Sequence, residues 1–206
     1  MLQATLLPLA ALLGLLLAVH AASLQSRELV WLSAVSTTSR LKLADPGTFL
    51  FPDPQGIDLR ARWFSLRALF VDSEVERIAL LRDAQSAAAV HVQARPQWPY
   101  AWLNWARVSA ALYPAGKDWQ VALQRALVLD DAGWAFQISL AEFMLRHEAF
   151  MDPVVRADVE KSLLRNVLPN HDLKVALGRK GLFLALCEAP NSQEAKDFCA
   201  RPDVLR

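Results

Sequence analysis

The stretch RPQWPYAWLNWA, residues 95–106, places three tryptophans, one tyrosine and two prolines in twelve positions. Proline has a fixed φ angle and no amide donor, so Pro99 suits the first turn of a helix. Trp102 and Trp105 are three residues apart and therefore share one face of that helix. We expect a helix that begins at Pro99 and packs Trp102 and Trp105 into a core, with Trp98 in the preceding turn as the tryptophan best placed to meet a partner.

The same helical period continues along the chain. From Leu59 onward, apolar residues recur three and four apart, with almost none of the alternation that is typical of strands. Ser73 and Ser192 are suited to N-caps, and Pro153 to a first helical turn. The pattern predicts an all-α fold with helices at 59–71, 73–94, 99–113, 118–129, 133–149, 153–167, 172–187 and 192–200.

A degraded internal repeat accompanies this period. Trp105-Ala106 recurs as Leu140-Ala141 and again as Leu177-Gly178, at spacings of 35 and 37 residues. Each pair sets a bulky apolar residue beside a small one, which is what two closely crossing helices require. The repeat predicts successive helical hairpins that form an irregular α-solenoid.

These hairpins resemble tetratricopeptide repeats. Trp105-Ala106 matches the large-small pair of that repeat's first helix, and ALVLD at 126–130 matches the end of its second. Two positions depart from the pattern, because Asp131 stands where proline is usual and Ser109 where a large residue is usual. The resemblance implies about three tetratricopeptide-like hairpins over residues 73–186.

A narrower resemblance covers residues 60–170. An apolar N-terminus, a linker, RPQWPYAW at 95–102 and ALQRAL at 122–127 together look like the VpsP family of bacterial exopolysaccharide biosynthesis proteins. The resemblance implies a single membrane anchor, a repeat domain outside the cytoplasmic membrane, and a role beside polymerisation and export machinery. It supplies no catalytic residue.

The N-terminal segment has a membrane-directed composition. Residues 2–22 contain no Asp, Glu, Lys or Arg, and as a helix they would extend about 30 Å, enough to cross a bilayer core. Small residues around His20 resemble a cleavage site, but the basic start of a signal peptide is missing, so we favour an uncleaved anchor. We expect an anchor or signal segment at 1–23, a linker with turns at 24–58 and a tetratricopeptide-like domain at 59–206.

The sequence indicates less directly on which side of the membrane the body of the protein lies. Basic residues at 27, 40 and 42 follow the apolar segment and would by themselves favour a cytoplasmic body, although long domains translocate largely regardless of such charges. Cys187 and Cys199 are twelve residues apart, close enough to form a disulfide that would contribute about 2–4 kcal/mol in an exported domain. The alternative is two buried thiols. We expect the disulfide, and with it a single-pass protein of the bacterial inner membrane whose body lies in the periplasm.

Composition argues against several functions. Lys plus Arg total 22 against 21 for Asp plus Glu, which leaves no basic field for nucleic acid. The sequence contains no Gly-rich phosphate loop, Gly-x-Ser-x-Gly elbow or zinc-protease helix. We therefore expect no cofactor, no metal and no catalytic residue. The one enzymatic alternative is a polysaccharide-modifying activity centred on His147, Glu148 and Asp152.

Binding is the function that remains. Tetratricopeptide-like arrays usually offer a concave face lined by the first helix of each hairpin. We expect the core to contain Trp102, Trp105, Trp119, Leu140 and Ala141. We expect partner contacts on that face from Trp98, Asn104, Arg107, Gln137 and Lys174. The leading hypothesis is a scaffold for proteins of an exopolysaccharide synthesis and export complex, and an alternative is an aromatic surface that binds the polysaccharide directly.

Overall fold

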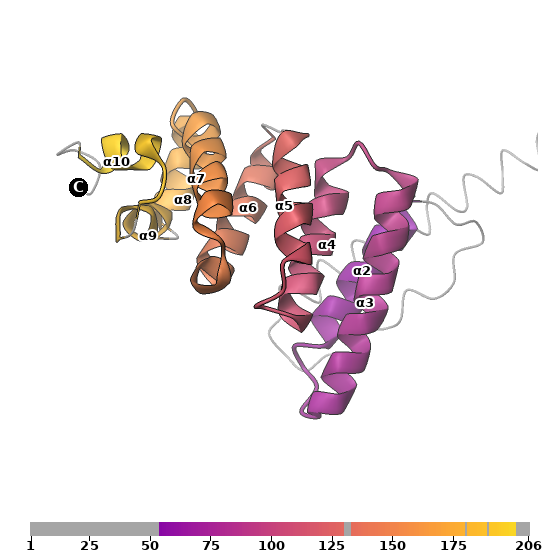
Figure 1. The fold of residues 1–206 in the computed structure, drawn as a ribbon. Coiled ribbons are helices and arrows are strands. Elements are labelled where there is room, and N and C mark those ends of the chain that lie inside the picture. The colour runs from indigo at the N-terminus through magenta and orange to yellow at the C-terminus, as the bar shows by residue number, and fades with distance from the viewer. Residues whose placement is uncertain (1–53, 130–132, 180, 189, 201–206) are drawn as a thin grey trace, which may run out of the picture. The chain divides into compact units, whose positions relative to one another are not determined.

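A computed structural model describes residues 54–129, 133–179, 181–188 and 190–200 of the chain. All regular elements in these described ranges are helical, as Figure 1 shows, and the all-α prediction is confirmed for them. The expected anchor or signal segment 1–23 lies outside the described ranges, as do most of the linker and Asp130. Of the helices in the described ranges, none combines the length and apolar character needed to cross a bilayer.

The chain divides into two compact units, residues 1–91 and 92–206. The sequence pattern predicted one helical domain from residue 59 onward. The boundary carries no compositional signal, because it falls inside a continuous helix, α3 (Glu74–Ala94), without a proline or glycine. Each unit is described separately below.

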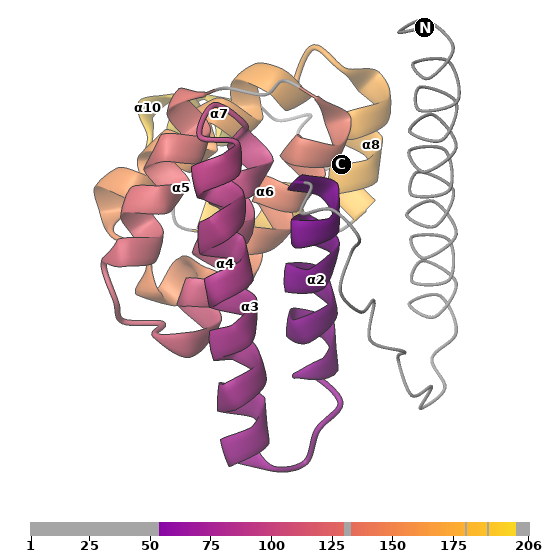
Figure 2. The same cartoon turned by 90° about the vertical axis from the view of Figure 1, so that its right-hand side faces the viewer.

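In the first unit, α2 (Pro54–Arg67) and α3 lie side by side and run in opposite directions, as Figure 2 shows. α2 begins five residues before the expected start, because Pro54 is tolerated at a first helical position although the surrounding residues resemble a turn. The hydroxyl of Ser73 accepts a hydrogen bond from the Glu76 amide at 3.4 Å, so the predicted N-cap is confirmed.

The interior of the first unit combines apolar packing with a buried carboxylate. Trp63 of α2 is almost fully buried, as are Ala84 and Ala88 of α3. Asp58 forms an ion pair with Arg62, and its other oxygen lies 3.4 Å from Nδ1 of the buried His91. Burial alone would raise the pKa of Asp58, but the contacts with His91 and Arg62 outweigh it and lower that pKa below the ordinary 3.8.

The second unit is a stack of helical hairpins. α4 packs against α5 and α6 against α7, while the first helices, α4 and α6, and the second helices, α5 and α7, also contact each other. α8 continues the row of first helices by packing on α6. The bounds are α4 (Pro99–Leu112), α5 (Asp118–Val128), α6 (Trp134–His147), the 3₁₀ turn η1 (Glu148–Phe150), α7 (Pro153–Val167), α8 (His171–Arg179), α9 (Leu182–Glu188) and α10 (Gln193–Cys199).

Local chemistry fixes the hairpin turns. Pro99 and Pro153 occupy first-turn positions as expected. Between α4 and α5, the indole nitrogen of Trp119 donates to the carbonyl of Pro114 at 3.0 Å. A Cβ at Gly116 would lie only 3.0 Å from the carbonyl oxygen of Tyr113, which explains a glycine at this tight turn.

The predicted helix 172–187 is wrong, because the structure divides it into α8 and α9. Gly181 lies between them with φ of 78°, a left-handed conformation that favours glycine and ends a right-handed helix. Gly178 permits a second close approach, since a Cβ there would lie 3.3 Å from two ring carbons of Phe183. The apolar spacing continues through the break and therefore concealed it.

The core of the second unit runs through all its hairpins. Trp119, Leu140 and Ala141 are fully buried, as expected. Trp102 and Trp105 are half-buried and pack against the edge of the core, so their assignment to its interior was wrong. The indole nitrogen of Trp102 donates to the Pro96 carbonyl at 2.8 Å, and this bond holds the ring toward the turn before α4.

Candidate functional site

The expected partner contacts are distributed over three alternate helices of the second unit. Trp98 is the N-cap residue of α4, and Asn104 and Arg107 lie along that helix. Gln137 belongs to α6 and Lys174 to α8. Trp98, Asn104 and Arg107 are half-buried, and Lys174 is exposed.

Gln137 is not a surface residue. Its side chain is fully buried, and neighbouring positions Phe136, Leu140 and Ala141 are buried with it. Residues 137 and 141 are four apart and share a face of α6, so the buried stripe of this helix includes position 137. The expectation that Gln137 contacts a partner is therefore wrong.

Arg107 connects two hairpins. Its guanidinium donates from Nη2 to the backbone carbonyl of Ser139 on α6 at 2.8 Å. A half-buried guanidinium that donates to a carbonyl has exchanged part of its hydration for a fixed protein contact. Arg107 thus has a structural task, the pairing of α4 with α6, in addition to any contact with a partner.

The start of α4 carries a row of aromatic contacts. The ring of Trp98 lies 5.5 Å from that of Tyr100, and Tyr100 lies edge-on to Phe136 of α6 at 5.3 Å. The Arg95 guanidinium lies 5.1 Å from the centre of the Trp98 ring, within cation–π range. Trp134, at the start of α6, is 51% exposed and was not among the expected contacts. Its position at the first residue of a first helix, equivalent to the aromatic start of α4, is the sequence signal that could have identified it.

The three residues of the enzymatic alternative have separate partners. His147 lies against the rings of Phe143 and Trp119, at 4.7 and 6.1 Å. An oxygen of Glu148 lies 3.6 Å from Arg156, and Asp152 caps α7 by accepting from the Val154 amide at 2.8 Å. Within the described ranges, no group of three His, Cys, Asp or Glu side chains is arranged to hold a metal ion.

The His147 imidazole is biased toward its neutral form. Burial lowers the pKa of His147 from its ordinary 6.5, and the positive charges of Arg146 and Arg107 lower it further. Its ring contacts are those of a packed aromatic side chain. A neutral imidazole is compatible with this apolar setting.

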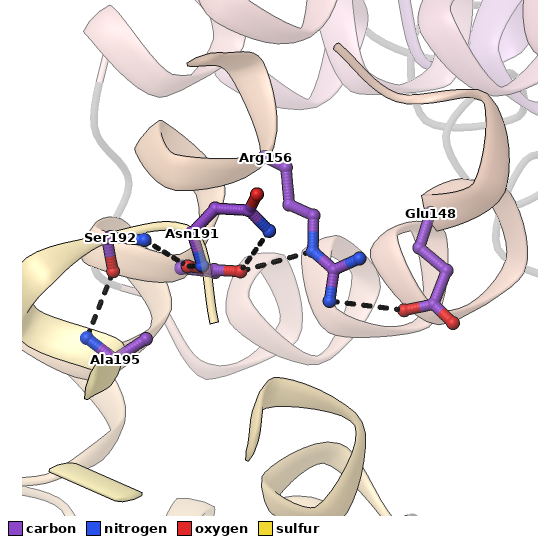
Figure 3. Close-up of polar contacts among 6 residues, drawn as sticks. Glu148, Arg156, Asn191, Ser192 and Ala195 are labelled. Atoms are coloured by element: carbon purple, nitrogen blue, oxygen red, sulfur yellow. Dashed lines mark hydrogen bonds and ion pairs between the residues drawn. The ribbon is translucent and has the colours of Figure 1, made fainter. Parts of the chain in front are cut away.

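Glu160 of α7 is the centre of a polar network at the C-terminal end of the stack, and Figure 3 labels its partners Arg156, Asn191 and Ser192. Its carboxylate is fully buried and accepts from Arg156 Nε at 3.1 Å and from the backbone amides of Asn191 and Ser192 at 2.9 and 2.7 Å. Ser192 in turn caps α10 by accepting from the Ala195 amide at 3.0 Å. This network, together with the buried Phe198, holds α10 against α7.

Sequence reasoning did not identify Glu160, although a signal exists. A carboxylate between the apolar Val159 and Leu163 must be paired if that face is buried, and Arg156 stands four residues earlier. The amide partners come from the loop before α10, which is 31 and 32 residues away and cannot be inferred from local spacing.

Cys187 and Cys199 form the expected disulfide, with their Cα atoms 5.5 Å apart. It joins α9 to α10. The α9–α10 connection is therefore fixed by one covalent bond and by one buried carboxylate.

The described part of the chain thus forms a helix pair and, in a separate unit, a stack of helical hairpins closed by a disulfide-linked helix. Comparisons with known protein families, curated proteins and solved structures find no match for this chain.

Proposed function

We propose that this protein is a membrane-anchored helical-repeat scaffold that binds other proteins outside the cytoplasmic membrane. The observation that carries the proposal is the similar sequence separation of the hydrogen bonds that join neighbouring hairpins. Arg107 contacts Ser139, Gln124 contacts Asp158 and Glu160 contacts Ser192, at separations of 32, 34 and 32 residues. Such regular neighbour contacts support the tetratricopeptide-like interpretation.

The binding surface of the scaffold is the face formed by α4, α6 and α8. The buried Gln137 is excluded from this surface. The surface includes the half-buried Trp98 and Asn104, the exposed Lys174 and the exposed Trp134. Tryptophan is frequent at binding hot spots because its large ring excludes water over a wide area. Arg107 contributes mainly by holding α4 to α6.

The cellular location and the partners of this scaffold are inferred mainly from the sequence. The apolar residues 2–22 support attachment to the bacterial inner membrane, and the disulfide supports a periplasmic body. The resemblance to the VpsP family suggests that the partners belong to an exopolysaccharide synthesis and export complex. Catalysis is not part of this proposal.

Affinity capture of the full-length protein from solubilised membranes of its native host tests the proposal. We expect recovery of a synthesis or export component, and loss of most of it with the double substitution Trp98→Ala and Lys174→Glu. Val121→Ala, at an exposed position of α5, is the matched control and should retain the partner. Recovery of no such component, or equal recovery with the double variant, would argue against the scaffold.

Direct polysaccharide binding is the second candidate, and the exposed ring of Trp134 favours it. Aromatic rings present apolar faces on which sugar rings can stack. If it is correct, purified polymer should change the tryptophan fluorescence of the wild-type protein, and Trp134→Ala should remove most of that change. An unchanged spectrum at saturating polymer would exclude this candidate.

A further inference from the structure

The turn between α2 and α3 exposes an unusual amount of apolar side chain. Leu69 and Phe70 are 70% and 66% exposed, and Val75, in the first turn of α3, is 80% exposed. All three belong to one end of the α2–α3 helix pair. We call these three residues the apolar tip.

The two arginines beside the apolar tip are paired with two glutamates, and the exposed Asp72 in the turn adds one further negative charge. Arg67 of α2 lies 3.4 Å from Glu76 of α3, and Arg77 donates to Glu74 at 2.8 Å. These pairs connect the two helices or lie within one of them, and the charge of Asp72 is negative, so the turn carries no net positive charge that would attract anionic lipid. The contact that the tip offers is therefore apolar.

The same chain contains an apolar N-terminal segment that would hold the apolar tip near a membrane. Residues 2–22 contain no charged side chain, and 31 residues separate them from the start of α2 at Pro54. A tether of that length keeps the helix pair within easy reach of the membrane that holds the apolar segment. Tethering also raises the effective concentration of the tip at that membrane, so two or three side chains suffice for contact.

We propose that the apolar tip inserts into the bilayer in which residues 2–22 are anchored. This inference rests on the membrane anchoring in the proposed function. Leu69 and Phe70 enter the acyl region beneath the headgroups, and Val75 lies at its boundary. The α2–α3 pair then stands on the membrane by its turn, and the contact does not depend on anionic lipid.

Fluorescence quenching in vesicles tests the insertion. The full chain carrying Phe70→Cys, labelled with an environment-sensitive dye, is reconstituted into phosphatidylcholine vesicles whose acyl chains bear a quencher. The native cysteines are joined in the disulfide and do not take the label. Val128→Cys, at a position 72% exposed on α5, is the matched control. We expect blue-shifted, strongly quenched emission at position 70 and no quenching at position 128, with the same result when anionic lipid is added.

The experiment distinguishes a failure of the insertion from a failure of the anchoring. If the chain floats with the vesicles but position 70 behaves like position 128, the insertion is overturned and the anchoring stands. If the chain does not float with the vesicles, the anchoring fails and the insertion fails with it.

A second variant tests the tip without a dye. Leu69→Ser combined with Phe70→Ser should leave the circular dichroism unchanged, because both side chains are exposed. In wild-type protein, vesicles should slow hydrogen exchange in the peptide that spans the turn, and in the variant they should not. Equal protection in both proteins would overturn the proposal.

Discussion

Trp119 and Trp102 are the same residue type in different surroundings. Trp119 is fully buried, contacts Phe143 and donates to Pro114, whereas Trp102 is half-buried. Truncation of a buried aromatic residue leaves a cavity, so Trp119→Ala should lower the free energy of unfolding by about 3–5 kcal/mol. Trp102→Ala should cost clearly less. Urea denaturation followed by circular dichroism measures both, and equal losses would contradict the assigned burial.

The pKa of His147 predicts a pH dependence of stability. Because folding lowers this pKa, the folded state binds the proton less readily than the unfolded state does. The stabilisation is complete above the unfolded value near 6.5 and is lost as the pH falls through the folded value. We expect an NMR titration of His147 with a midpoint below 6.5. His147→Phe keeps an aromatic ring and should flatten the fall in stability between neutral and mildly acidic pH; an unchanged slope would assign that fall to other groups.

Individual residues were predictable where their role is local. Ser192 caps α10 because its hydroxyl reaches an amide three residues away, a distance encoded in the sequence itself. The buried position of Gln137 depends on the helix that packs over it. The role of Glu160 likewise depends on a loop that only the tertiary fold brings near.

At the scale of elements, Gly181 is the position where one substitution tests the break between α8 and α9. Its φ is 78° and nothing lies within 4 Å of an added Cβ, so the backbone angle alone opposes a side chain. Gly181→Ala should therefore cost about 1–2 kcal/mol of stability. Gly181→Asn is the control and should cost less, because asparagine tolerates this conformation. Thermal unfolding measures both, and a neutral Gly181→Ala would contradict the left-handed turn.

The helices were largely predictable because their buried faces follow a 3.6-residue period and because several of them, α3, α4, α7 and α10, start at a proline or serine. α4 and α7 begin at the expected prolines. The division at Gly181 was missed because glycine also occurs within helices, and its backbone angle is not visible in an apolar pattern.

At the scale of the whole molecule, the hairpin stack should transmit a local defect only to neighbouring elements. Glu160→Gln removes a buried charge and replaces the oxygen that accepts from Arg156 with an NH₂ group when the remaining oxygen faces the two amides, and should lower stability by about 2–3 kcal/mol. α10 packs on α7 and α9, so hydrogen exchange should rise in α9 and α10 and remain unchanged in α4.

Glu194→Gln is the matched control for this experiment, because Glu194 is an exposed carboxylate paired with Lys161 at 3.4 Å. It should leave both stability and exchange nearly as in the wild type. A uniform rise of exchange through the whole second unit in Glu160→Gln would indicate a single cooperative block instead of a stack.

The overall class of the fold was predictable, but its division into two units was not, because the boundary lies in an unbroken helix. The binding surface was predictable only in part. Side-chain period identifies which helices could form it, whereas the exposure of Trp134 and the burial of Gln137 follow from the rotation of α6 within the stack.

The hydrogen bonds between Glu160 and the loop before α10 should affect the rate at which Asn191 deamidates. Asn-Ser sequences deamidate when the backbone nitrogen of the serine attacks the asparagine side chain and closes a cyclic imide. At 191–192, that nitrogen donates to Glu160 at 2.7 Å and is held away from such an attack. Prolonged incubation should therefore convert Asn191 to aspartate faster in Glu160→Ala, which removes the acceptor, than in wild type, as peptide mass spectrometry would show; equal rates would mean that this hydrogen bond gives no protection.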